Sequence, residues 1–235
     1  MRSVPPVVFV CLLGLVACAP AGSSAYVSAN APLNGECLAS DGDVFISTGL
    51  YDVLSARTEK TACIRPYRMA LVINSNLVSN AKVSTGRVEP NVLRVEYADV
   101  RLMDNTEGTL GFEARNNVVP PNPFRVYTTA TVPPSTGEEP SMGWVQLDAI
   151  PSVYAEQLRG YAGDSILVEI QLFGRTTSDV TVDFQRFLYP LAICSDCLSA
   201  CRSDFTDLSI LTELNSGKCT DNRPQDDRVC VDPEC

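Results

Sequence analysis

The chain has 235 residues, of which 45% are hydrophobic and 20% charged, so it is long enough to bury the core of one large domain or two modest ones. Its formal net charge of −10 argues against nucleic acid as a partner, because phosphate recognition needs clustered Lys and Arg. The absence of His excludes Ser-His-Asp and Cys-His nucleophiles, His general bases and His-ligated zinc.

The amino terminus has the layout of a secretory signal. Arg2 gives a short positive start, and residues 4–16 form an almost wholly apolar run. This run is shorter than the roughly 17–25 residues that a membrane-spanning helix needs, and it suits the hydrophobic region of an export signal. We therefore predict a signal peptide over residues 1–17.

The sequence LVAC, at residues 15–18, resembles the lipobox of bacterial lipoproteins. The resemblance implies that the Cys18 thiol receives a diacylglyceryl group, that the chain is cut before this residue, and that acyl chains anchor the protein in a membrane. Ala19 stands where an Asp would favour the inner membrane, so the outer membrane is implied. The alternative is an ordinary signal that is cleaved after Ala17 or Ala21 and leaves Cys18 unmodified.

The rest of the chain divides by composition. The stretch after Cys18 is small, polar and rich in Pro, Gly and Ser, which is typical of a flexible tether. Most of the cysteines crowd into the last part of the sequence. We predict a signal peptide over residues 1–17, a lipidated Cys and tether over 18–36, a β-sandwich domain over 37–190, and a Cys-rich, disulfide-bonded tail over 191–235.

The body of the chain shows short alternating patterns that predict strands and little helix. Leu93, Val95 and Tyr97 alternate with polar residues, and the apolar phase shifts after Ala98 and Asp99, which suggests a β-bulge there. Further strands are predicted over residues 43–47, 67–73, 124–132 and 143–150.

Two stretches of the body are predicted to lie outside strands. Residues 133–142 begin with two prolines and predict a long exposed loop. Residues 152–159 predict a two-turn helix that is capped by Ser152 and stopped by Gly160.

The clearest hairpin lies near the end of the body. Apolar and polar residues alternate over residues 165–173 and again over 180–184, and residues 174–179 turn the chain between them. About seven short strands at regular spacing predict an all-β fold, an immunoglobulin-like or fibronectin-like antiparallel β-sandwich with a disulfide-rich C-terminal extension. The hairpin residues expected in the core are Ile166, Val168, Ile170, Leu172, Val180, Val182 and Phe184.

The chain has ten cysteines. Cys11 leaves with the signal and a lipidated Cys18 cannot pair, so an even number remains, as expected for disulfides in an exported protein. We expect Cys37 to pair with Cys63, whereas the connectivity of the other six stays open. The disulfide candidates are Cys37, Cys63, Cys194, Cys197, Cys201, Cys219, Cys230 and Cys235.

The tail allows two other interpretations. Cys194 and Cys197 form a C-x-x-C pair, which would be redox-active in a thioredoxin-like βαβ unit, but no such unit is predicted around it. Together with Cys219 and Cys230 they could form a Cys₄ metal site, but the spacings fit poorly and the compartment is oxidising. We expect structural disulfides and no metal. Residues 205–214 have helical spacing and predict a short amphipathic helix.

No motif assigns a reaction. Gly163, Asp164 and Ser165 match the GDS block of lipolytic hydrolases, but that family needs a downstream His, which this chain lacks. Asp226 and Asp227 belong to an acidic group that matches no calcium-binding loop. We therefore predict no catalytic residue and no cofactor, and a protein that is not an enzyme.

The whole layout resembles lipoproteins of myxobacterial type with a Cys-rich C-terminal segment, a resemblance that implies no activity. We expect a lipid-anchored binding, adhesion or assembly module of the cell envelope, whose partners are the membrane and an envelope protein. The alternatives are an envelope enzyme that hydrolyses glycans with paired carboxylates, and a carrier of a small ligand or a metal.

Overall fold

The computed structural model of the chain describes residues 24–33, 39, 44–53, 66–78, 80–82, 87–89, 91–114, 118–136, 139–195, 197, 199–201 and 230–232. Within these ranges no helix is long and apolar enough to span a membrane.

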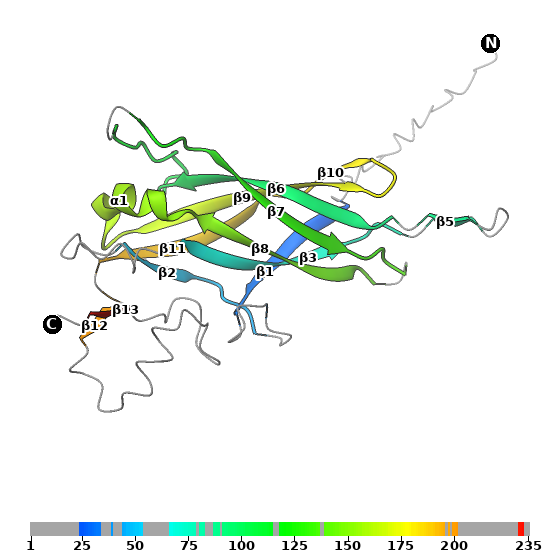
Figure 1. Cartoon of the computed structure of the whole chain (residues 1–235), viewed down its shortest axis with the longest axis horizontal. Helices are drawn as coiled ribbons and strands as arrows, with labels where there is room; N and C mark the ends of the chain where they lie inside the picture. The colour runs from blue at the N-terminus through cyan, green and yellow to red at the C-terminus, as the bar shows by residue number, and fades with distance from the viewer. Residues whose placement is uncertain are drawn as a thin grey trace, which may run out of the picture.

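Two sheets make up the body of the protein (Figure 1). The first has the order β1-β3-β8, formed by β1 (Ala25–Ala31), β3 (Tyr67–Ser75) and β8 (Ser141–Ile150). The second has the order β2-β11-β9-β6-β7, formed by β2 (Gly49–Asp52), β11 (Phe187–Cys194), β9 (Ser165–Thr176), β6 (Leu93–Met103) and β7 (Phe124–Val132), with β10 (Thr181–Asp183) paired to β9.

Smaller elements make up the rest of the secondary structure in the described part of the chain. Two short two-stranded sheets join β4 (Asn80–Lys82) to β5 (Arg87–Glu89) and β12 (Ser199–Cys201) to β13 (Cys230–Asp232). Between β8 and β9 run a 3₁₀ turn (Ser152–Tyr154), the helix α1 (Ala155–Leu158) and a second 3₁₀ turn (Arg159–Tyr161).

This architecture confirms the predicted all-β sandwich. The chain crosses between the two sheets at β1–β2, β2–β3, β3–β6, β7–β8 and β8–β9, as in immunoglobulin-like sandwiches, whereas β6 and β7, and β9 to β11, follow one another within the second sheet. The start of the chain contributes to both sheets, since β1 runs antiparallel to β3 in one and β2 runs parallel to β11 in the other. The β2–β11 pair is a parallel exception in a body whose other strand pairs are antiparallel among the described residues.

The core lies between the sheets and follows the period of two that the sequence shows. On β9 the side chains of Ile166, Val168, Ile170 and Leu172 are buried, and they alternate with partly exposed neighbours. Met69, Leu71 and Ile73 of β3 are also buried and belong to the same apolar cluster. Val182 and Phe184 are buried as predicted, whereas Val180 is 59% exposed because it lies in the turn before β10.

The tether predicted over residues 18–36 is wrong for residues 25–31, because they form strand β1. Ala25, Asn30 and Ala31 are buried, and the strand pairs with β3 through a register shift between Val27 and Ala29. Small residues give this strand no strong apolar alternation. It is nevertheless held by the backbone hydrogen bonds of the sheet and by close packing on β3.

The boundary predicted between sandwich and tail, at residues 190 and 191, divides a strand. β11 continues to Cys194, and its Leu191 and Ile193 side chains are buried in the core. The helix predicted over residues 205–214 lies outside the described residues.

The loop predicted over residues 133–142 is shorter and better fixed than expected. β8 already begins at Ser141, and Ser135 is buried. The Ser135 N–H donates to the carbonyl oxygen of Leu77 at 2.7 Å, and its hydroxyl donates to the carbonyl oxygen of Glu139 at 2.6 Å.

The helix between β8 and β9 has a single α-helical segment of four residues, flanked by 3₁₀ turns. It starts at Ser152 as predicted, but no side chain caps it, and Pro151 occupies the N-cap position. It continues through Gly160 to Tyr161, so Gly160 does not stop it.

Candidate binding face

The second sheet exposes one face to solvent, which we call the outer face. It is formed by side chains of β6, β7 and β9 that alternate with core residues. The side chains that define it are Tyr97, Asp99, Arg101, Arg125, Tyr127, Glu169 and Phe173.

Three aromatic side chains form a row across the outer face. Tyr97 of β6 stands opposite Phe173 of β9 and Tyr127 of β7 in the strand register. The Tyr97 and Phe173 rings are stacked with centroids 4.8 Å apart, and the Tyr97 and Tyr127 rings meet edge to face at 6.4 Å. Tyr127 is 79% exposed, so the row ends in an aromatic ring whose apolar surface is in unfavourable contact with water.

A β-bulge positions the central ring. The register of β6 against both β7 and β9 shifts between Val95 and Tyr97, which brings Tyr97 to the outer face. The bulge predicted at Ala98 and Asp99 therefore lies a few residues earlier in the strand. Relative to β9, Glu96 is the extra residue, and its exposed side chain lies beside the aromatic row.

Arg125 covers the aromatic row. Its guanidinium carbon lies 3.8 Å from the centroid of the Tyr97 ring, which is a cation–π contact. The same guanidinium donates two hydrogen bonds to the Asp99 carboxylate, at 2.7 and 2.9 Å. These hydrogen bonds raise the pKa of Arg125 above its usual value, and the charge of Asp99 adds to the effect. The arginine is thus held over the ring as a positive group positioned by Asp99.

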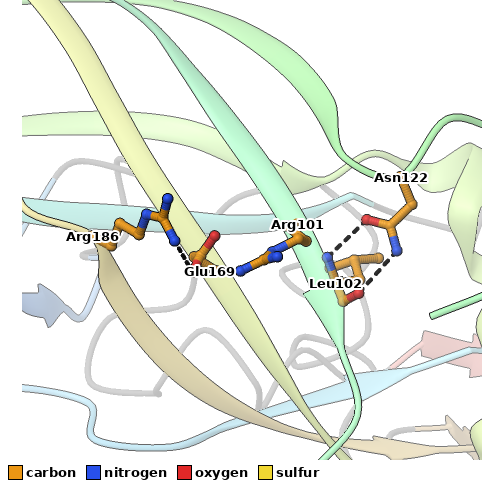
Figure 2. Close-up of polar contacts among 5 residues, drawn as sticks. All are labelled: Arg101, Leu102, Asn122, Glu169 and Arg186. Atoms are coloured by element: carbon orange, nitrogen blue, oxygen red, sulfur yellow. Dashed lines mark hydrogen bonds and ion pairs between the residues drawn. The ribbon is translucent and has the colours of Figure 1, made fainter. Parts of the chain in front are cut away.

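Next to this row, one carboxylate binds two arginines (Figure 2). Glu169 accepts hydrogen bonds from Arg101 at 2.9 Å and from Arg186 at 3.4 Å. The side chain of Glu169 is only 14% exposed, whereas that of Arg186 is 60% exposed. Arg101 lies on β6, Glu169 on β9 and Arg186 directly before β11, so both contacts depend on the position of β9 between these elements.

Asn122 fixes the edge of the outer face at the end of β6 (Figure 2). Its side-chain oxygen accepts a hydrogen bond from the Leu102 N–H at 2.9 Å. Its amide group donates to the carbonyl oxygens of Leu102 and Leu110, both at 2.9 Å. At this point β7 has not yet begun. The Asn122 side chain therefore makes the hydrogen bonds to the β6 backbone that a neighbouring strand would otherwise make.

The charge of the outer face differs from that of the whole chain. Five arginines and five carboxylates lie on or beside it, a local balance of 0, so the chain's total of −10 lies entirely on the remainder. These residues are Arg94, Arg101, Arg125, Arg175, Arg186, Glu96, Asp99, Glu169, Asp179 and Asp183.

A second cluster lies where β2 and β11 end. Cys194 and Cys197 are joined by a disulfide with Cα atoms 5.9 Å apart, and Asp52 lies beside them. These three residues could offer three metal ligands only after the disulfide is reduced. A neighbouring carboxylate disfavours the thiolate on which disulfide exchange depends, so the surroundings favour a structural disulfide.

The other predicted site residues are less defined. Cys201 and Cys230 lie on the paired strands β12 and β13, for which the backbone alone is described. Cys18, Cys37, Cys63, Cys219 and Cys235 lie outside the described residues.

Sequence reasoning missed the aromatic row. In the alternation of β9, Phe173 takes the next outward position after the polar residues Glu169 and Gln171. In β7, Tyr127 takes the next outward position after Arg125. An aromatic residue in the polar phase of a half-buried strand is the signal that could have revealed it. The chain matches no protein-family model and no curated protein sequence.

Proposed function

We propose that this protein is a non-enzymatic binding module of the bacterial cell envelope, anchored through a lipid on Cys18, which docks an envelope protein on its outer face. The observation that carries the proposal is the row of Phe173, Tyr97 and Tyr127, in which Arg125 lies over the Tyr97 ring and Tyr127 is 79% exposed. Tyr and Arg are the side chains that most often dominate the binding energy of protein interfaces.

The dimensions and the charge of the outer face support a protein as the partner. The three strands that form the outer face, spaced about 4.8 Å apart and about 30 Å long, cover roughly 430 Å². With β11 and β2 beside them the sheet reaches roughly 700 Å², close to the roughly 800 Å² that each partner contributes to a standard interface. The net charge of the outer face is close to zero, so a protein partner can approach it closely although the rest of the molecule is acidic.

The alternatives have less support. A glycan hydrolase needs two carboxylates free to flank the scissile bond. On the outer face, Asp99, Glu96 and Glu169 each contact a guanidinium group instead. A metal carrier at Asp52, Cys194 and Cys197 would require reduction of the disulfide.

Lipid attachment at Cys18 is tested by metabolic labelling with a palmitate analogue. The wild-type chain should be labelled, and Cys18→Ser should not, because serine offers no thiol for the diacylglyceryl group. Equal labelling of both chains would show that the LVAC motif is not used and would remove the anchor from the proposal.

Docking on the outer face is tested with a benzophenone amino acid placed at Tyr127 in the full chain. Val118, which is 65% exposed and lies outside this sheet, is the matched control position. In intact envelopes, illumination should give a discrete, protease-sensitive adduct at position 127 and none at 118. Equal patterns at both positions, or an adduct that only a glycosidase removes, would contradict a protein partner on this face.

A further inference from the structure

The chain enters the sandwich at one identifiable end, which we call the anchor end. Asn76 donates its backbone N–H to the carbonyl oxygen of Ser24 at 2.9 Å, and Ala25 forms a bridge with Phe184 beside β10. β10 and the β4–β5 hairpin lie at this end, and α1 lies at the opposite end (Figure 1). The two ends are separated by the length of β8, ten residues or about 33 Å.

The link from Cys18 to this end is short. Six residues lie between Cys18 and Ala25, the first residue of β1, so the link has seven Cα-to-Cα steps. Fully extended, such a link spans at most about 25 Å. A lipid on Cys18 therefore keeps the anchor end within this distance of the bilayer, which is less than the length of the sandwich.

Exposed apolar side chains lie at the anchor end. Val78 follows β3 and is 49% exposed, and Val180 lies in the turn before β10 and is 59% exposed. Asn91 connects the two segments, because its amide donates to the Val78 carbonyl oxygen at 2.8 Å and its side-chain oxygen accepts from the Ser178 hydroxyl at 3.4 Å. Val78 and Val180 therefore lie on two segments that these hydrogen bonds join into one surface at the anchor end.

The opposite end is where β11 ends, at Cys194. This end lies next to the segment that follows α1, because Gly163 donates to the carbonyl oxygen of Ile193 at 2.8 Å.

We propose that the anchor end rests on the lipid surface, with Val78 and Val180 in contact with the headgroup region and the α1 end directed away from the membrane. The outer face is then roughly perpendicular to the membrane plane, and a partner that lies beside the protein on the same membrane can reach it. This inference rests on the lipid anchor at Cys18 that the proposed function includes.

Single-Trp variants test this orientation. Trp144 is the only Trp of the chain, so Trp144→Phe leaves a background into which Val180→Trp or Val153→Trp is introduced. Val153 is 66% exposed and lies in the 3₁₀ turn before α1, which makes it the matched control. The lipidated full-length proteins are incorporated into vesicles of phosphatidylcholine and phosphatidylglycerol that are brominated near the headgroup, and flotation confirms that they are bound.

Tryptophan at position 180 should lose emission in brominated vesicles relative to unbrominated ones, and tryptophan at 153 should not. Equal quenching at both positions, or stronger quenching at 153, in protein that floats would overturn the orientation and leave the anchor intact. Protein that carries no lipid and does not float would remove the anchor, and the orientation with it. Cys18→Ser in the position-180 background should show no quenching, which excludes lipid-independent adsorption.

Discussion

Replacing Ile170 with alanine is expected to lower the free energy of unfolding by about 2–5 kcal/mol, a large share of the roughly 5–15 kcal/mol that stabilises a domain. Ile170 is fully buried at the centre of β9, where it pairs with Val100 on one side and Phe187 on the other. The truncation removes apolar contacts and leaves a cavity between two sheets that cannot close fully around it. Urea unfolding followed by far-UV circular dichroism measures the change.

Val153→Ala is the control for this measurement. Its side chain is 66% exposed, so the free energy of unfolding should change by no more than about 0.5 kcal/mol. If Ile170→Ala were silent while Val153→Ala destabilised the protein, β9 would not supply the core and the sandwich described above would be wrong.

Gly174→Ala is expected to destabilise the protein by about 1–3 kcal/mol through overpacking. A Cβ at this position would collide with the backbone carbonyl oxygen of Arg94 and lie 3.2 Å from the Cα of Val95, at the bulge of β6. The obstacle is backbone, so relief requires that β6 and β9 move apart. Because Tyr97 and Phe173 lie on these strands next to the bulge, the same change should weaken the photoadduct at Tyr127.

Gly160→Ala is the matched glycine control, since a Cβ there meets no atom within 4 Å. It should leave stability unchanged or raise it by about 0.4–1 kcal/mol, because alanine restricts the unfolded chain more than glycine does. Equal losses in thermal unfolding for both variants would show that the close contact with Arg94 is not the cause.

Together, the two destabilising changes connect the core with the outer face. Ile170 and Glu169 are adjacent in β9, and one packs inward while the other binds Arg101 and Arg186. The rigid core therefore sets the register on which every contact of the outer face depends. A binding face on strands needs no loop to order on docking, which reduces the entropic cost of association.

The sequence alone determined where most strands lie, because alternation is a local property that follows from which side chains can be buried. Residues 165–173 were assigned to a strand on this basis, and β9 covers them. The same local reasoning failed for β1, whose alanines and Ser28 provide little apolar contrast. It also placed the boundary between sandwich and tail inside β11, because the composition changes at residue 191, before the strand ends at Cys194.

Only the tertiary structure decided which strands are neighbours and which of their outward-facing side chains come into contact. An alternating strand fits equally well beside any other, and the choice depends on backbone hydrogen bonds between segments far apart in the chain. The pairing of β9 with both β6 and β11 is such a choice, and it places Phe173 on Tyr97. The approach of Asp52 to Cys194 was undecided for the same reason, since β2 and β11 meet across more than a hundred residues.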